Sequence, residues 1–151
     1  MKPLYIIPAR GGSKGIPRKN IKSLGGRPLI YYSIDCAAKA AERFGGYILV
    51  STDDDEIADT ARACGIEVGY MRPASLGADT TSSRDVMLDA MGWADGRGID
   101  YDCVVLLQPT SPLRTCEDVA AAIEMYSPDI DMVVSVCEAD ALSLIHISEP
   151  T

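Results

Sequence analysis

The segment best equipped for chemistry is a run of glycines and cations over residues 8–20. It combines three glycines with four basic side chains, namely Gly11, Gly12, Gly15, Arg10, Lys14, Arg18 and Lys19. Glycines let backbone N–H groups come close to a phosphate, and arginine and lysine neutralise its charge. The pattern predicts a site for a phosphorylated ligand, and the competing interpretation is a basic loop that only faces solvent.

Two common phosphate-binding motifs are absent from this segment. It lacks the GxxxxGK[ST] signature of a P-loop, and residues 11–15 do not follow the GxGxxG pattern of dinucleotide-binding folds. A dinucleotide-dependent oxidoreductase is therefore disfavoured.

The distribution of charge also singles out the N-terminal region. The 151-residue chain has 14 Lys and Arg against 22 Asp and Glu, a net charge of −8. Residues 1–34 hold seven bases and no acid, a net of +7, whereas residues 35–151 hold the other seven bases and all 22 acids, a net of −15. The acidic total argues against a nucleic-acid partner, and the cationic segment is where an anionic ligand is expected.

Composition indicates a soluble globular protein with reduced thiols. Apolar residues make up 47% of the chain and charged residues 24%. No apolar run is long enough for a membrane span or resembles a signal peptide, so we expect a cytoplasmic protein without a membrane partner. The five cysteines form no CxxC pair, and we expect reduced, mostly buried thiols, with Cys36, Cys64 and Cys103 in the core. A single histidine excludes a zinc site built on several histidines.

Strand and helix patterns alternate along the chain. Apolar runs predict strands over residues 4–7, 47–50, 66–70, 103–107 and 132–136. Helical spacing predicts helices over residues 28–44, 53–64, 82–93 and 115–126. This alternation indicates an α/β fold with a mainly parallel sheet and helices on both faces.

Local signals mark the ends of these helices. Thr52 or Asp53 is expected to cap the second helix and Thr115 the fourth. Glycines at positions 92, 96 and 98 are expected to break the third helix. The acidic run at residues 53–56 could hold a metal, but acids are favoured at any helix N-terminus, and we interpret the run as a helix start.

Ligands of such sheets bind beyond the carboxyl ends of the strands. That rule selects three segments as the candidate site, namely residues 8–20, 51–54 and 108–114.

Four motifs in this order resemble those of the acylneuraminate cytidylyltransferases, the CMP-sialic acid synthetases. They are residues 7–21 (IPARGGSKGIPRKNI), residues 50–54 (VSTDD), residues 72–74 with 79–83 (RPA and DTTSS), and residues 106–114 (LLQPTSPLR). Residues 133–136 also fit, and the resemblance covers about residues 3–138. Four ordered motifs are far more specific than any one loop.

The resemblance implies a three-layer Rossmann-like fold of the nucleotide-diphospho-sugar transferase type. It also implies attack by the anomeric hydroxyl of a nonulosonic acid on the α-phosphate of CTP, which releases pyrophosphate. The implied partners are CTP and an acidic nine-carbon sugar, with Mg²⁺ as cofactor and a homodimer as the full-length assembly. Such a transfer depends on positioning and charge neutralisation, which suits a cationic loop.

Matched residue by residue, the resemblance implies that the basic segment binds the triphosphate. Arg10, Ser13 and Lys14 would hold the phosphates, with Gly11 and Gly12 in the same nucleotide-binding loop. Arg10 is also expected to be catalytic because it would offset phosphate charge.

Roles for five further residues follow from the same match. Lys19 would contact the α-phosphate as a catalytic residue, and Asn20 would contact the nucleotide. Arg72 and Ser83 match positions that face the cytosine and ribose, and Gln108 matches a position that faces the acidic sugar. Taken without the family match, Arg72 could only brace a turn and Gln108 could only satisfy strand-end backbone groups.

The chain departs from the resemblance after about residue 139. The late Asp-containing motif that would bind magnesium is not matched, so no metal ligand is assigned in this sequence. We expect a cytidylyltransferase domain, incomplete at its C-terminus, over residues 1–140 and a non-native tail over residues 141–151, in which His146 has no catalytic role. A natural divergent C-terminus is the alternative.

Several related functions remain open at this point. Legionaminate or pseudaminate fits nearly as well as sialic acid, and a non-catalytic nucleotide-binding module is a further class. Ketodeoxyoctonate cytidylyltransferases and sugar-1-phosphate nucleotidylyltransferases share the strand, basic loop and helix plan, but residues 11–15 and 108–112 argue against both.

The unmatched magnesium motif generates a first prediction. A polypeptide of these 151 residues is expected to be inactive, marginally stable or both. An assay for magnesium-dependent formation of a CMP-sugar from CTP checks this expectation, and turnover by the purified chain would contradict it.

Overall fold

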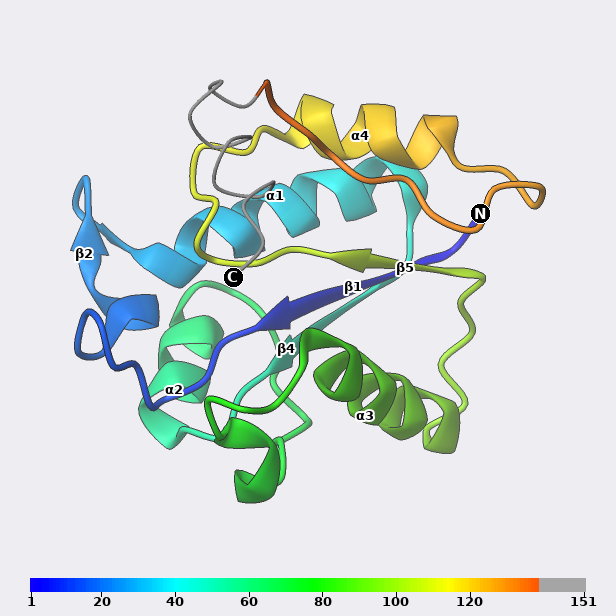
Figure 1. The fold of residues 1–151 in the computed structure, drawn as a ribbon. Coiled ribbons are helices and arrows are strands. Elements are labelled where there is room, and N and C mark those ends of the chain that lie inside the picture. The colour runs from blue at the N-terminus through cyan, green and yellow to red at the C-terminus, as the bar shows by residue number, and fades with distance from the viewer. Residues whose placement is uncertain (139–151) are drawn as a thin grey trace, which may run out of the picture. The chain divides into compact units, whose positions relative to one another are not determined.

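Three parallel strands carry the segments that sequence analysis selected (Figure 1). The computed structural model describes residues 1–138, and the chain divides into two units, residues 1–119 and 120–151. The strands all belong to the first unit and are β1 (Pro3–Pro8), β4 (Tyr47–Ser51) and β5 (Cys103–Leu106). β1 lies in the middle, and its Ile6 pairs with Leu49 of β4 and Leu106 of β5. The predicted α/β fold with a parallel sheet is confirmed.

Helices cover both faces of this sheet because the central strand is apolar on both sides. Leu4, Tyr5, Ile6 and Ile7 are completely buried, as expected for a strand inside a parallel sheet. Leu4 and Ile6 pack in one cluster with residues of α3 (Ser83–Gly96), and the alternate side chains point to the opposite face, which α1 (Leu29–Phe44) covers (Figure 1). Burying one such side chain stabilises the fold by about 2 kcal/mol.

Most helix boundaries follow the local signals in the sequence. α1 ends at Gly45, whose φ of 71° lies in the region that favours glycine. α4 (Cys116–Met125) begins after Thr115, whose hydroxyl accepts a hydrogen bond from the Asp118 N–H at 3.1 Å, as predicted. α2 (Asp55–Ala63) is capped by Asp54, which accepts from the Ile57 N–H at 3.0 Å. The expectation that Thr52 or Asp53 caps this helix is wrong, because the helix begins later.

The third helix is longer than its glycines predict. α3 continues through Gly92 and ends at Gly96, so Gly92 does not break it. Ala90 and Ala94 are both completely buried against the sheet. This packing holds the helix through a residue whose own helix propensity is poor by about 1 kcal/mol.

Two predicted strands do not form in the described residues. Residues 66–70 do not form a strand, although Val68 and Tyr70 are buried. The alternating apolar side chains of this segment therefore pack in the core, but its backbone does not pair with the sheet. Residues 132–136 are irregular, and Met132, Val134 and Val136 are exposed there. A strand needs a neighbour that offers backbone partners, which an apolar pattern alone does not supply.

Short regular elements lie between β1 and α1. A 3₁₀ turn spans Lys19–Ile21, and a small antiparallel hairpin joins β2 (Ser23–Leu24) to β3 (Arg27–Pro28). Gly25 and Gly26, with φ of 59° and 84°, form its turn, for which glycine is favoured. A second 3₁₀ turn spans Ala74–Gly77.

All five cysteines are free, but fewer are buried than predicted. Cys36 is buried, Cys64, Cys103 and Cys116 are half-buried, and Cys137 is exposed. Burial raises the pKa of Cys36 and of Cys103 to about 11, so both are protonated thiols at neutral pH. The expectation of mostly buried thiols is wrong, because four of the five lie at partly or fully accessible positions.

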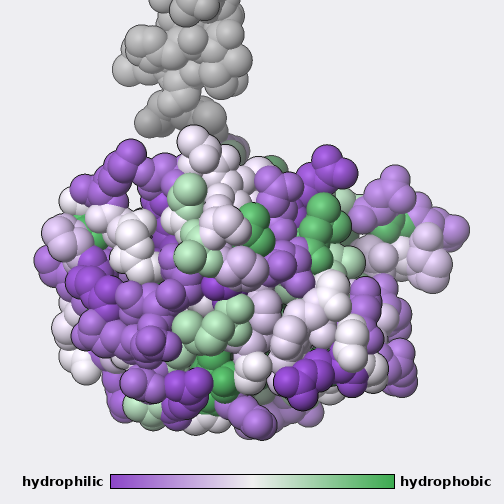
Figure 2. Space-filling model, turned by 90° about the horizontal axis from the view of Figure 1, so that it is seen from below, coloured by the Kyte–Doolittle hydropathy of each residue, from purple (hydrophilic) through white to green (hydrophobic). Residues whose placement is uncertain are grey.

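The surface agrees with the charged composition. Figure 2 shows a face that is mostly hydrophilic, on which hydrophobic residues gather only in small separate patches. Within the described part of the chain, no helix is both long and apolar enough to cross a membrane. The predicted tail at residues 141–151, with His146, lies outside the described residues.

The buried central strand generates a prediction about stability. Ile6→Ala is expected to lower the free energy of unfolding by about 2–5 kcal/mol, because a completely buried side chain leaves a cavity. Leu88→Ala, on the 52% exposed Leu88 of α3, is the matched control and should cost far less. Urea denaturation measures both, and equal losses would contradict the assignment of β1 as the core strand.

Candidate functional site

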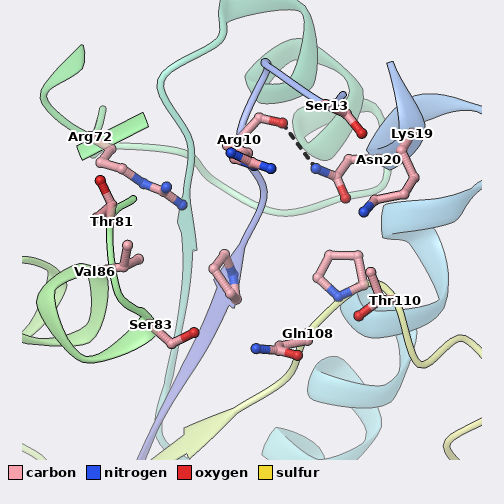
Figure 3. A pocket seen from close by; sticks show the side chains of 12 residues that line it. Arg10, Ser13, Lys19, Asn20, Arg72, Thr81, Ser83, Val86, Gln108 and Thr110 are labelled. Carbon is pink, nitrogen blue, oxygen red and sulfur yellow. Dashed lines mark hydrogen bonds between the residues drawn. The ribbon is translucent and has the colours of Figure 1, made fainter. Parts of the chain in front are cut away.

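The candidate site is an open cleft of about 220 Å³ beyond the ends of β1 and β5 (Figure 3). Twelve residues line it, namely Pro8, Arg10, Ser13, Lys19, Asn20, Arg72, Thr81, Ser83, Val86, Gln108, Pro109 and Thr110. Seven of them are residues that sequence analysis selected.

The topology of the sheet places the cleft there. From β1 the chain passes through α1 to β4 on one side, and later returns to pair β5 with the other side of β1. The connections on the two sides of β1 therefore run in opposite directions across the sheet, and this reversal leaves a crevice beyond the ends of β1 and β5. The residues after β1 and β5 meet in this crevice, as predicted for two of the three selected segments.

Two chemically different sides face each other across the cleft. Figure 3 shows Ser13, Lys19 and Asn20 on one side and Arg72, Thr81, Val86 and Ser83 on the other. Gln108 and Thr110 come from the segment after β5. The first side offers donors to an anion, and the second combines hydroxyl groups with one apolar side chain and a guanidinium.

Among the described residues, three cations and no carboxylate line the cleft. The cations are Arg10, Lys19 and Arg72. Among the described residues no ion pair involves Lys19, so its ammonium is available to a ligand. A cleft with this lining favours a polyanion, since both attraction and the relief of cation repulsion contribute.

Arg72 is held rigidly at the edge of the cleft. Its side chain is buried, and its Nε donates to Ser51 Oγ at 3.0 Å while Nη2 donates to the Ser51 carbonyl at 2.7 Å. Nη1 donates to the carbonyl of Leu76 at 3.2 Å. Burial lowers the pKa of Arg72, although an arginine stays charged at neutral pH. Arg72 therefore both braces the backbone and faces the cleft, so the two sequence interpretations are compatible.

Asn20 fixes the start of the basic segment. Its side chain is buried, and its Nδ2 donates to the carbonyl of Arg10 at 3.0 Å, the bond drawn in Figure 3. Asn20 also lines the cleft. The side-chain oxygen of Asn20 is not used in this bond, and it lies on the same amide group that holds the backbone of Arg10.

Three residues selected from the sequence do not line the cleft. The N–H of Gly11 donates to Asp53 Oδ1 at 2.9 Å, so it is already engaged within the protein. Gly12 lies outside the lining, and the Lys14 side chain is 85% exposed.

Asp79 pairs with two of the expected phosphate-binding cations. Its carboxylate contacts Arg10 Nη1 and Lys14 Nζ. These contacts hold the pKa of Asp79 below its usual range, and the contact with Lys14 has a larger effect than the one with Arg10. Asp79 is therefore charged at neutral pH. An anionic ligand that needs both cations has to compete with Asp79.

Sequence reasoning missed five lining residues. Thr110 and Pro109 follow β5 within a segment that was selected as a whole, so its position was a usable signal. Thr81 lies in the motif at residues 79–83 but was given no role, and Val86 lies in the first turn of α3, whose N-terminus no strand rule selects. Pro8 lies in the selected segment at residues 8–20 but was given no role of its own.

Known proteins are similar in sequence to this chain over nearly its whole length. Residues 4–141 match the family described as cytidylyltransferase. The chain belongs to the cytidylyltransferase family. The resemblance inferred from the four motifs is thereby confirmed.

Individual cytidylyltransferases show how far the similarity extends. The chain is 40% identical over 141 residues to an N-acylneuraminate cytidylyltransferase of Streptococcus agalactiae, which covers 93% of this chain and 33% of that protein. It is 38% identical over 136 residues to a CMP-N,N′-diacetyllegionaminic acid synthase of Legionella pneumophila, which covers 90% of this chain and 58% of that protein. The chain thus spans between a third and three fifths of these relatives.

A solved cytidylyltransferase shares the fold. A CMP:2-keto-3-deoxy-manno-octonic acid synthetase in complex with CTP superimposes with a TM-score of 0.68 at 25% identity, over 82% of this chain and 46% of that chain. The three-layer Rossmann-like fold predicted for this cytidylyltransferase is confirmed.

The Asp79 contacts generate a prediction about anion binding. Asp79→Asn is expected to strengthen binding of inorganic triphosphate several-fold, because a neutral amide competes less well for Arg10 and Lys14. Asp100→Asn is the matched control, since it also removes one negative charge but pairs with Lys2 instead. Calorimetric titration at low salt compares the two, and equal effects would show that only net charge matters.

Proposed function

We propose that the cleft binds CTP and that the chain serves a reaction joining CMP to a nonulosonic acid. The observation that carries this proposal is the convergence of Arg10, Lys19 and Arg72 in a cleft that no carboxylate of residues 1–138 lines. A nucleoside triphosphate brings a chain of negative charges and a neutral base, which suits the two different sides of the cleft.

The triphosphate belongs on the side of the basic segment. Arg10, Ser13 and Lys19 present a guanidinium, a hydroxyl and an ammonium there, all donors to phosphate oxygens. Lys14 lies next to this side with an exposed side chain and reaches the phosphates after it leaves Asp79. Gly11 and Gly12 shape the loop, and Asn20 contacts the nucleotide from its buried position.

The cytidine belongs on the opposite side. Arg72 and Ser83 present donors to the base and ribose, and Val86 adds an apolar surface for the base. Because Arg72 is immobilised by three hydrogen bonds, little conformational entropy is lost when it binds a ligand.

The chemistry is a transfer of the cytidylyl group. The oxygen of the sugar's anomeric hydroxyl forms a bond to the α-phosphorus, and the bond from that phosphorus to the bridging oxygen of the β-phosphate breaks. The hydroxyl proton passes to water, and pyrophosphate leaves with the bridging oxygen. Lys19 and Arg10 act as catalytic residues because their charges offset the negative charge that grows on the phosphoryl oxygens.

The sugar is an acidic nonulosonic acid next to Gln108. Its side chain lies in the cleft and offers both an amide donor and a carbonyl acceptor to the sugar. The relatives named above act on different nonulosonic acids, namely N-acylneuraminate and N,N′-diacetyllegionaminate. The chemical class is therefore proposed, and its individual member is left to experiment.

The described residues do not provide a set of ligands for the expected Mg²⁺. No group of three or more His, Cys, Asp or Glu is placed to hold a metal within residues 1–138. The described residues that line the cleft offer neutral oxygens and cations, a poor donor set for Mg²⁺. No step of the proposed mechanism is therefore assigned to the metal.

Nucleotide binding by the chain itself tests this proposal. We expect CTP to raise Tm, ATP to raise it less, and NAD to leave it unchanged, because at equal concentration a ligand that binds the folded state more tightly stabilises it more. Lys19→Gln should weaken CTP binding by about tenfold, the value of one charge-assisted contact of about 1.4 kcal/mol. Thermal unfolding and calorimetric titration provide the measurements.

A second lysine of the same region serves as the control. Lys22→Gln removes a charge from an exposed side chain outside the cleft and should leave CTP affinity nearly unchanged. An equal response to CTP, ATP and NAD would overturn the cytidine assignment.

A further inference from the structure

Two acids outside the cleft contact the basic loop, defined here as residues 10–19. Asp53 and Asp54 lie between β4 and α2. Neither lines the cleft. Because they contact the loop, these two members of the acidic run at residues 53–56 have a structural role besides starting α2.

Arg18 and Asp54 form a two-bond ion pair. Arg18 Nη1 lies 2.6 Å from Asp54 Oδ2, and Arg18 Nη2 lies 3.0 Å from Asp54 Oδ1. Parallel bonds of this kind fix direction as well as distance. Glu56, the second residue of α2, contacts the same guanidinium. Arg18 is therefore turned toward the β4–α2 junction and away from the cleft.

The backbone at Arg18 is constrained. It is the one non-glycine residue with a positive φ, 54°, among the described residues. Such a conformation costs about 1 kcal/mol for a residue with a β-carbon, so the surrounding contacts must hold it. The next residue, Lys19, starts the 3₁₀ turn and points into the cleft.

The other end of the basic loop is held by the same junction. The N–H of Gly11 donates to Asp53 Oδ1 at 2.9 Å, and the N–H of Ala9 donates to the Ser51 carbonyl at 2.8 Å. A β-carbon on Gly11 would lie 2.6 Å from Asp54 Oδ2, too close for any side chain. Glycine is thus required at position 11 by the close approach of Asp54.

The charge state of the pair supports a permanent contact. The Arg18 guanidinium holds the pKa of Asp54 below its usual range, and the Ile57 N–H acts in the same direction. Asp54 is therefore ionised throughout the neutral range.

We propose that Asp54 and Arg18 are positioning residues that hold the basic loop in its phosphate-binding shape. Each end of the loop carries one fixed residue beside one cleft residue, Gly11 beside Arg10 and Arg18 beside Lys19. Arg18 acts through this geometry and does not contact the ligand, although its charge alone would suggest a phosphate contact. The proposal rests on the proposed function, because it concerns the site to which CTP is assigned.

A double-mutant cycle with two readouts tests the pair. Arg18→Gln, Asp54→Asn and the double variant are compared for CTP affinity by calorimetry and for amide hydrogen exchange over residues 9–21. Asparagine caps a helix as well as aspartate does, so Asp54→Asn removes the ion pair and keeps the cap on α2. Urea unfolding verifies that each variant is folded.

Non-additive losses are the expected result. Each single variant should lower CTP affinity by about tenfold and speed amide exchange in the loop, and the double variant should be little worse than either single one. Arg18→Lys should fall between wild type and Arg18→Gln, because an ammonium keeps the charge and loses the parallel bonds. Asp59→Asn breaks the comparable pair of Asp59 with Arg62 on α2 and should change neither readout.

Three outcomes overturn the proposal. Arg18→Gln could weaken CTP binding while exchange in the loop stays at the wild-type rate, which would make Arg18 a direct ligand contact. The two single losses could add in the double variant, or Asp54→Asn could change neither readout.

The cycle also separates this proposal from the function on which it rests. If the wild-type chain binds neither CTP nor inorganic triphosphate, the proposed function fails. Faster exchange in both single variants, without further effect in the double one, would still support the anchoring of the loop.

Discussion

Repulsion between like charges is the constraint on which the candidate site depends. Four cations lie within residues 10–19, and two unit charges 4 Å apart repel by about 1 kcal/mol in water and about 4 kcal/mol near a protein surface. The fold offsets this repulsion with acids from other segments, Asp54 and Glu56 for Arg18, and Asp79 for Arg10 and Lys14. Lys19 has no such partner among the described residues, which leaves its charge for a ligand.

The parallel sheet brings these charges and acids together. β1, β4 and β5 run in the same direction, so the segments that follow them meet at one edge. The segments after β1 and β5 line the cleft, and the segment after β4 supports it from outside through Asp53 and Asp54. A single edge thus holds both the ligand-facing side chains and the groups that orient them.

Elements with strong local signals were predictable, and those that depend on distant partners were not. β1, β5 and α1 follow from apolar runs and helical spacing that their own residues contain. Residues 66–70 and 132–136 have the same apolar character but no strand pairing in the described structure. α3 shows the opposite case, because burial of Ala90 and Ala94 carries the helix past Gly92.

The sequence by itself determined the family, the α/β class and the membership of most of the site. It did so because the basic segment and the residues after β1 and β5 are local motifs with a characteristic order. Only the tertiary structure decided what each charge does. Arg18 and Lys19 are adjacent and both basic, yet one binds Asp54 and the other faces the cleft. Their directions depend on a positive φ at Arg18 and on an acid 36 residues further along the chain, which meets it only because β4 pairs with β1.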